Sequence, residues 1–229
     1  MIALHGVTVF RPGTRGKDAI LHEQDAVFAA RSRVGILAPA GSGRTTLVRV
    51  LAGISLPDRG HVHLTGRVSW PIGYAGMLHP MLTLEQNLRH IAELIGARLS
   101  TMQRQIAWVC GDADVLGKKV QDLTPGDRAN AALALSLAIP ADHYVADEKI
   151  SVGDENARGR ADALLKMRLE GAALLYMSRN TTQLKHWCTD FRVLLNGKLV
   201  WCPNPETGQK MIEIASERVI QGGADRANV

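Results

Sequence analysis

A run of small residues joins an apolar segment to a helix-forming segment near the start of the chain. The run reads Ala38-Pro39-Ala40-Gly41-Ser42-Gly43-Arg44-Thr45-Thr46. Apolar residues dominate the preceding segment 33–37, and those that follow at helical spacing are Leu47, Val48, Val50 and Leu51. A strand–loop–helix order of this kind turns backbone N–H groups towards one point and adds the partial positive charge of a helix N-terminus. The sequence therefore predicts a loop that binds phosphate.

The run departs from the phosphate-loop pattern G-x-x-x-x-G-K-[ST] at two positions. Ala38 stands where the first glycine belongs, and Arg44 replaces the lysine. Gly43 and Thr45 match the pattern. Arginine keeps the positive charge but replaces a compact ammonium group with a wide planar one. The loop alone leaves open the alternative of a glycine turn that binds no ligand.

A second apolar segment ends in two carboxylates. Tyr144-Val145-Ala146 is followed directly by Asp147 and Glu148. Asp147 is suited to hold Mg²⁺ together with the Thr45 hydroxyl, and Glu148 to orient and deprotonate a water that attacks a γ-phosphate. The alternative is an acidic pair that simply faces water at the end of a strand. The loop and the pair together predict a nucleotide hydrolase.

The order of the remaining segments predicts the fold class. Short strands are expected at 2–10, 26–30 and 33–37, and capping-box sequences at Thr83–Gln86 and Ser100–Gln103 predict two consecutive helices. Asn196-Gly197 predicts a hairpin, followed by a last helix over about 206–220 and a frayed tail. Later strands and helices alternate, which indicates an α/β fold with a mostly parallel sheet core, N-terminal antiparallel strands and an inserted helical subdomain.

The same pattern predicts the domain organisation. We expect a single domain over 1–229, in which 1–75 and 123–229 form a nucleotide-binding core and 76–122 the helical subdomain.

Composition excludes several classes of protein. Hydrophobic residues make up 46% of the chain and charged residues 21%, as in ordinary globular proteins. The longest apolar stretch, Ala131–Ala141, is shorter than the about 20 residues that span a membrane. Three scattered cysteines do not suit a disulfide framework. The net charge of +5 suits phosphate or an anionic membrane surface without demanding nucleic acid. We therefore expect neither a secreted nor an integral-membrane chain.

The motifs resemble those of the ATP-binding cassette (ABC) ATPases over nearly the whole chain, which implies a P-loop NTPase core. That family carries an LSGGQ signature at the start of a helix before the acidic pair. Here Leu123-Thr124-Pro125-Gly126-Asp127 occupies that place, with Gly126 lying 21 residues before Asp147. The family's D-loop, which follows the acidic pair, is matched by Val152-Gly153-Asp154.

The resemblance implies roles for further residues. Phe10 corresponds to the aromatic residue that stacks on adenine, and Thr124 and Gly126 to groups that contact the nucleotide of the opposite subunit. Arg179 stands at the switch histidine, and His79 near the glutamine that contacts Mg²⁺ and couples to the membrane partner. A surface arginine and an exposed loop histidine are the alternatives for these two. The implied site uses Glu148, Arg179 and His79 in catalysis, Thr45 and Asp147 for Mg²⁺, and Phe10, residues 38–46, Thr124 and Gly126 for ATP.

A narrower resemblance is to the ATPase subunits of capsular-polysaccharide and O-antigen exporters. It rests on Val68-Ser69-Trp70-Pro71-Ile72-Gly73-Tyr74-Ala75-Gly76, on Leu82-Thr83 with Gln86-Asn87-Leu88, and on Asp147-Glu148 continuing through Ser151-Val152-Gly153-Asp154. This implies a peripheral ATPase on the cytoplasmic face of the inner membrane. It would dimerise with a second copy or another ABC ATPase subunit and act on an integral-membrane permease. The polysaccharide cargo would be met only indirectly, and nucleic acid not at all.

Departures from the family pattern support an alternative function. Arg44 and Arg179 replace family residues, and Pro125 lacks a backbone N–H at a position where the signature has glycine. The alternative is a degenerate subunit that binds ATP but hydrolyses little, acting as a regulator or as one half of a heterodimer. A soluble ABC protein that acts on nucleic acid is the second alternative, but this chain has neither the second cassette nor the long coiled-coil insertion that such proteins usually carry.

Overall fold

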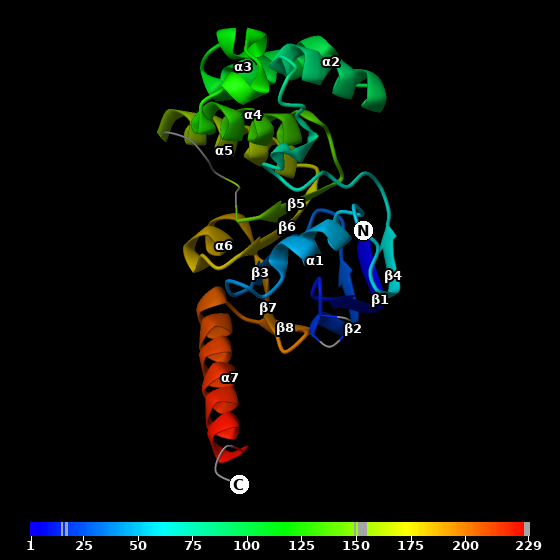
Figure 1. Ribbon diagram of the computed structural model, residues 1–229, viewed down its shortest axis with the longest axis vertical. Coiled ribbons are helices and arrows are strands. Elements are labelled where there is room, and N and C mark those ends of the chain that lie inside the picture. Colours follow the sequence, from blue (N-terminus) through cyan, green and yellow to red (C-terminus); the bar gives the residue numbers. More distant parts are fainter. Residues whose placement is uncertain (15, 17, 149, 151–154, 227–229) are drawn as a thin grey trace. The chain divides into compact units, whose positions relative to one another are not determined.

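The computed structural model describes residues 1–14, 16, 18–148, 150 and 155–226 (Figure 1). The chain divides into two compact units, one formed by 1–65 with 174–229 and the other by 66–173. These limits group 66–75 and 123–173 with the helical segment, whereas the sequence assigns them to the core. The division into a nucleotide-binding core and a helical subdomain, with boundaries at 75 and 123, remains a prediction.

An antiparallel sheet contains the N-terminal strands of the first unit. β1 (Ile2–Phe10) lies between β2 (Ala19–Phe28) and β4 (Arg59–Leu64). The predicted strand at 26–30 is therefore too short and starts too late. The polar residues 22–25 in the middle of β2 are held in the sheet by pairing with β1, which continues from Ile2↔Phe28 to Phe10↔Ala19 through several register shifts. Tertiary pairing here overrides local propensity.

A second sheet of the first unit carries the phosphate loop. β3 (Arg33–Leu37) is paired in parallel with β6 (Ala173–Ser178) on one side and with β7 (Asp190–Leu195) on the other, and β8 (Lys198–Cys202) adds to β7 in antiparallel. β3 and β6 are buried and almost wholly apolar, as parallel strands covered on both faces are. The carboxyl ends of β3 and β6 meet at one edge, with Leu37 opposite Ser178.

Within the described residues, three helices complete the first unit. They are α1 (Arg44–Leu51), α6 (Thr181–Trp187) and α7 (Pro205–Arg226). α6 packs against β3, and α7 against β7. The hairpin prediction is confirmed, because Asn196 and Gly197 join β7 to β8 with φ of 47° and 74°. α7 extends to Arg226, beyond the predicted end near 220.

The second unit is mainly helical. Its helices are α2 (Leu84–Ile95), α3 (Leu99–Cys110), α4 (Pro125–Ala138) and α5 (Glu155–Leu169), with short 3₁₀ turns at Ala75–Met77, Asp114–Gly117 and Val120–Asp122. α3 packs against α2, α4 and α5. β5 (His143–Asp147) carries the acidic pair, and the segment 68–72 runs beside it through bridges Val68↔His143 and Ile72↔Ala146.

The two capping-box predictions have different outcomes. Thr83 accepts a hydrogen bond from the N–H of Gln86, whose side chain accepts one from the N–H of Thr83, so the predicted cap of α2 is confirmed. The predicted cap of α3 is wrong: the helix begins at Leu99, and Arg98 at its N-cap makes no side-chain capping bond within the described structure. The helix starts there because the N–H groups of Thr101 and Met102 already donate to the Arg98 carbonyl, over 3.0 and 3.2 Å.

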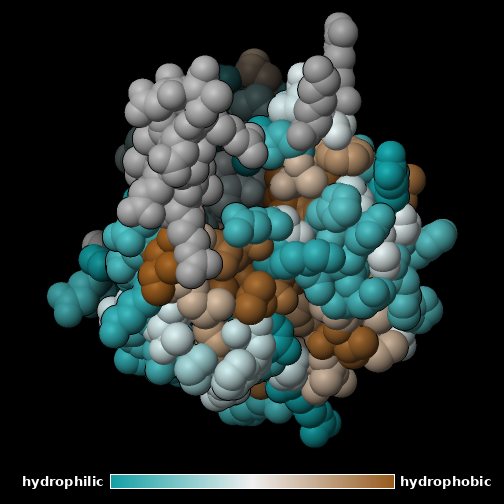
Figure 2. Space-filling view, turned by 90° about the horizontal axis from the view of Figure 1, so that it is seen from below, coloured by the Kyte–Doolittle hydropathy of each residue, from teal (hydrophilic) through white to brown (hydrophobic). Residues whose placement is uncertain are grey.

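Among the described residues, none of the helices has the length and apolar character required to cross a lipid bilayer. On the face shown in Figure 2, hydrophobic side chains appear in patches between hydrophilic ones.

Candidate functional site

The phosphate loop lies between the end of β3 and the start of α1. The Ala38 N–H donates to the Ser178 carbonyl oxygen over 3.1 Å, which fixes the start of the loop to the end of β6. Ala38 is fully buried, so its methyl group is accommodated where the pattern has glycine. At the other end, the Leu47 N–H donates to the Gly43 carbonyl oxygen over 3.0 Å and begins the helix.

Two glycines shape the loop. Gly41 and Gly43 adopt φ of 75° and 90°, a region that other residues rarely occupy. A Cβ atom at Gly43 would lie 2.5 Å from Cγ1 of buried Ile20, whereas one at Gly41 would meet no described atom within 4 Å. Gly43 is therefore required by both backbone and packing, and Gly41 by backbone alone.

The loop fits a phosphate group. The Ser42 Oγ atom is buried and has no hydrogen-bond partner among the residues that the structure describes. The first turn of α1 contains no acidic residue, and Gly43 at the N-cap offers no side-chain capping bond within the described chain. A buried hydroxyl, turned N–H groups and a helix N-terminus are the donors that phosphate oxygens accept.

The cationic candidates of the first unit lie at this loop. Arg44 is the first residue of α1, and Thr45 and Thr46 follow in its first turn. Arg179 comes directly after β6 and is exposed. Because Ser178 pairs with Leu37, Arg179 leaves the sheet at the same edge as the phosphate loop.

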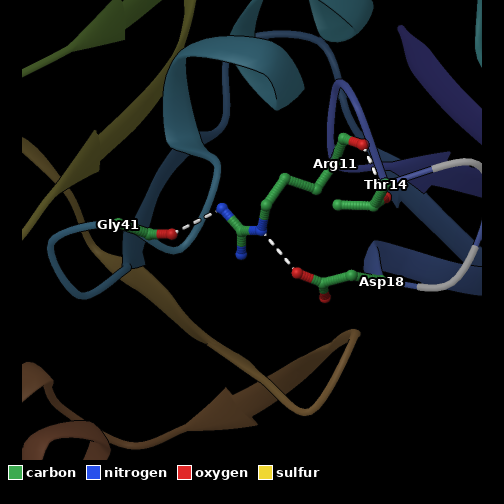
Figure 3. A network of polar contacts seen from close by, with 4 residues as sticks. All are labelled: Arg11, Thr14, Asp18 and Gly41. Atoms are coloured by element: carbon green, nitrogen blue, oxygen red, sulfur yellow. Dashed lines mark hydrogen bonds and ion pairs between the residues drawn. The ribbon is translucent and has the colours of Figure 1, made fainter.

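Phe10 belongs to the same unit, at the end of β1. Its N–H donates to Asp58 Oδ2 over 2.7 Å, and the guanidinium carbon of Arg59 lies 5.8 Å from the ring centroid, within cation–π range. Sequence reasoning missed the next residue: Arg11 donates to the carbonyl oxygen of Gly41 over 2.7 Å (Figure 3). No sequence signal marks that contact, because it joins segments 30 residues apart.

The acidic pair lies in the second unit, at the carboxyl end of β5. Val145 is held from both sides, since its N–H donates to Ser69 Oγ and its carbonyl accepts from the Ile72 N–H. Asp147 is the last strand residue, and Glu148 has φ of 56°. A non-glycine residue in this region is uncommon, and such residues cluster at functional sites.

His79 is exposed on the segment before α2. Its backbone is fixed by buried Asn87, which accepts from the His79 N–H over 2.7 Å and donates to its carbonyl over 3.1 Å. Nδ1 of His79 accepts from the Met81 N–H over 3.3 Å, which leaves the proton of a neutral ring on Nε2. A metal contact through Nε2 would require this bond to break.

The signature residues begin α4. The Thr124 hydroxyl accepts from the Asp127 N–H over 3.1 Å and donates to Asp127 Oδ2 over 2.8 Å, so it caps the helix. Pro125 takes the first helical position, which favours proline, and Gly126 is exposed. The D-loop residues 152–154 lie outside the described residues.

The structure thus brings together the phosphate loop, Arg179 and Phe10 in one unit, and the acidic pair, His79 and the signature in the other. The predicted sharing of Mg²⁺ by Thr45 and Asp147 joins residues of the two units and remains a prediction.

Comparison with known proteins gives the family. The ABC transporter family model matches residues 21–151, more than half of the chain. The chain belongs to the ABC transporter family. The family predicted from the motifs is therefore confirmed.

Relatives of this ABC protein include several transport proteins. It is 27% identical over 199 residues to the capsule polysaccharide export ATP-binding protein CtrD of Neisseria meningitidis serogroup B, covering 87% of this chain and 92% of CtrD. It is 26% identical to the polysialic acid transport ATP-binding protein KpsT of Escherichia coli, covering 86% and 90%. It is 30% identical to the ATP-binding protein BexA of Haemophilus influenzae, covering 72% and 76%.

Solved structures confirm the fold. The dimeric structure of a bacterial ABC transporter cassette matches with a TM-score of 0.71 at 17% identity, covering 87% of this chain and 96% of that one. A dimeric post-hydrolysis cassette bound to ADP and phosphate matches with a TM-score of 0.73 at the same identity and coverage. The predicted α/β cassette fold is therefore confirmed.

Proposed function

We propose that this ABC chain is the ATP-binding and ATP-hydrolysing motor subunit of a transporter that exports a polysaccharide. The observation that carries the proposal is the phosphate loop, with two glycines at positive φ and the buried Ser42 hydroxyl, which has no hydrogen-bond partner within the described part of the chain. The names of CtrD and KpsT support polysaccharide as the class of cargo. A subunit that binds ATP without hydrolysing it is the weaker candidate, because Asp147 and Glu148 are both present.

The first unit would bind the nucleotide. Loop N–H groups and the start of α1 receive the phosphates, while the charges of Arg44 and Arg179 stand at the same edge. Phe10 would offer one face of its ring to adenine. The Arg59 guanidinium lies over the same ring and is attracted to it by a cation–π interaction.

The acidic pair of the second unit, together with Thr45 of the first, would supply the groups for hydrolysis. Thr45 and Asp147 are the residues that would hold Mg²⁺, which when bound neutralises charge on the β- and γ-phosphates. Glu148 would orient the attacking water and accept its proton. Glu148 has a left-handed φ of 56°, so the backbone leaves the extended course of β5 directly after Asp147.

Two copies would enclose two nucleotides. Each copy would contribute the Gly126 N–H at the start of α4 to the nucleotide held by the other, since a helix N-terminus attracts anions. The Thr124 hydroxyl donates to Asp127 in the single chain, so this donor becomes available to the partner's nucleotide only if it turns away from Asp127.

A pocket of the second unit offers a place for the membrane partner. It has a volume of about 540 Å³ and lies between the ends of α2 and α4 and the start of α3. Trp70, Ile95 and Met102 line it with apolar surface, and its lining also contains Arg67, Arg98 and Arg168. This surface suits a short permease helix with apolar residues and an acidic side chain. Arg98→Glu should abolish stimulation of ATP hydrolysis by the permease while leaving the basal rate unchanged.

Phosphate release and gel filtration test the proposed hydrolysis. The purified chain should release phosphate from Mg-ATP, and Glu148→Gln should nearly abolish release while trapping an ATP-bound dimer. Glu155→Gln, which removes the exposed carboxylate at the start of α5, is the matched control and should behave as the parent. Equal rates for Glu148→Gln and the parent would show that Glu148 is not the base. Tight ATP binding without turnover, alone or with the permease, would favour the non-hydrolysing subunit.

The cargo is tested in cells. Deleting this chain from its source organism should abolish surface polysaccharide and leave the polymer inside the cell. The parent chain should restore export, and Glu148→Gln should not. Normal surface polysaccharide in the deletion strain would contradict the proposed cargo. It would not contradict the proposed ATP hydrolysis, which the phosphate-release assay tests separately.

A further inference from the structure

A turn between β1 and β2 is tied to the phosphate loop by one arginine. Arg11 donates through Nη1 to the Gly41 carbonyl oxygen over 2.7 Å, and through Nε to Asp18 Oδ2 over 2.5 Å. In Figure 3 the extended Arg11 side chain reaches from the turn to Gly41, with Asp18 on its other side. The guanidinium group therefore bridges two acceptors from different segments.

The turn itself holds the backbone of Arg11. The Arg11 N–H donates to the Asp18 carbonyl over 2.8 Å, and the Arg11 carbonyl accepts from both the N–H and the hydroxyl of Thr14, over 3.2 and 2.7 Å. Phe10, the candidate for adenine stacking, is the preceding residue, and a Cβ atom at Gly16 would lie 3.7 Å from its ring. Hydrogen bonds within the turn thus fix the backbone of Arg11, from which the side chain extends to the loop.

The contact acts on a particular peptide unit. The Gly41 carbonyl and the Ser42 N–H belong to one planar trans peptide, so they point in opposite directions. Holding the carbonyl towards Arg11 turns the Ser42 N–H away from Arg11, where it donates to the Pro39 carbonyl over 3.3 Å. That length is beyond the usual range for N–H···O bonds, so this donor is only weakly engaged and can be taken over by a better acceptor.

Among the described residues, the long Ser42–Pro39 bond is the other hydrogen bond that holds this peptide, and packing around Gly41 adds no restraint. Gly41 has no side chain, and no described atom lies within 4 Å of the place that a Cβ would occupy. Turning over the Gly41–Ser42 peptide changes ψ of Gly41 and φ of Ser42, and glycine, which has no Cβ, leaves the first of these two angles free. The bond from Arg11 is the shorter of the two hydrogen bonds that favour the present orientation, 2.7 Å against 3.3 Å.

We propose that Arg11 is a positioning residue of the nucleotide site, which fixes the Gly41–Ser42 peptide so that the Ser42 N–H is presented to a phosphate group. Through the same residue, the turn next to Phe10 and the phosphate loop are held as one unit. The ligand in this proposal, a nucleoside diphosphate or triphosphate, rests on the proposed function; the control of the peptide by Arg11 does not.

If the Arg11–Asp18 ion pair served only to stabilise the fold, removing Arg11 would lower the thermal denaturation midpoint. The Arg11 and Asp18 side chains are 37% and 52% exposed, and ion pairs so exposed contribute little to folding. Removing Arg11 should therefore leave the thermal denaturation midpoint nearly unchanged. Its effect should be confined to the loop and to ligands that carry phosphate.

Two measurements test the proposal, one without any ligand. In the free protein, hydrogen exchange of the amides in residues 40–46 should be about tenfold faster in Arg11→Ala. In calorimetry, the same variant should bind ADP and Mg-ATP about tenfold more weakly, as expected for loss of one hydrogen bond to a charged donor. Adenosine, which has no phosphate, should bind the parent and the variant equally.

Conservative and control variants sharpen the result. Arg11→Lys keeps the charge but offers one nitrogen in place of two, so it should recover part of the affinity. Arg192→Ala removes a comparable arginine–aspartate pair, the 2.9 Å contact with Asp190, and should change neither exchange in 40–46 nor ADP affinity. Should Arg11→Ala fail to fold, Arg11→Gln replaces it in both measurements.

The outcomes separate this proposal from the proposed function. Unchanged exchange and unchanged ADP affinity in Arg11→Ala would overturn the role of Arg11, as would equal weakening of adenosine and ADP. A parent protein that binds no nucleotide would overturn the proposed function, while the exchange measurement would still decide whether Arg11 controls the peptide.

Discussion

Replacing Gly43 by alanine tests the geometry of the phosphate loop. At φ of 90° an alanine costs about 1–2 kcal/mol in backbone conformation. Its Cβ would also lie 2.5 Å from Ile20 Cγ1, and overpacking of this kind typically costs about 1–3 kcal/mol. Gly43→Ala should therefore lower the free energy of unfolding by about 2–5 kcal/mol in urea denaturation. Gly41→Ala, with similar φ and no clash, should lower it by only about 1–2 kcal/mol.

A double-mutant cycle isolates the clash. Ile20 is 3% exposed, so Ile20→Ala alone should cost about 2–5 kcal/mol. Ile20→Ala removes the atoms that the new Cβ at position 43 would meet. In the Gly43→Ala background, Ile20→Ala should therefore lower the free energy of unfolding by about 1–3 kcal/mol less than it does in the parent. Additive effects of the two substitutions, or equal effects of Gly43→Ala and Gly41→Ala, would refute the packing argument.

Three further predictions concern other parts of the chain. Thr83→Ala should destabilise the fold by about 1 kcal/mol in chemical denaturation, because it removes the cap of α2, whereas Ser100→Ala should change stability by less than about 0.5 kcal/mol; equal effects would contradict the assignment of the caps. Burial raises the pKa of the Cys188 thiol from 9.0 to about 12, so above about pH 9 the unfolded chain loses a proton that the folded chain keeps. Stability should then fall with rising pH by up to about 1.4 kcal/mol per pH unit from this thiol, and Cys188→Ala should show a correspondingly shallower fall in denaturation measured from pH 8 to 10.5. Arg44→Lys should raise the rate of phosphate release, since a compact ammonium reaches phosphate oxygens more easily than a planar guanidinium; a lower rate would indicate a loop shaped for arginine.

Local rules explain which parts of the fold follow from the sequence. The phosphate loop, the Asn196-Gly197 hairpin and the cap of α2 each depend on residues within a few positions of one another. Glycine at positive φ and a threonine–glutamine pair leave little freedom to such short segments. These are the places where sequence and structure agree most closely.

Long-range contacts explain the differences. β2 begins at Ala19 because its pairing with β1 continues as far as Phe10↔Ala19. The bond from Arg11 to Gly41 depends on the return of the chain through β2 and β3, which no short motif encodes. The hydrogen bond between the Thr124 hydroxyl and Asp127 is local. Its role as a helix cap follows from the start of α4 at Pro125, which the structure gives.

The central claim is that the phosphate loop and the acidic pair bind one metal–nucleotide complex. The most direct measurement is the anomalous scattering of Mn²⁺, substituted for Mg²⁺, in crystals of Glu148→Gln with ATP. The account predicts one metal peak per nucleotide, within ligand distance of both the Thr45 hydroxyl and the Asp147 carboxylate. A metal bound away from either residue, or crystals without nucleotide at saturating ATP, would contradict it.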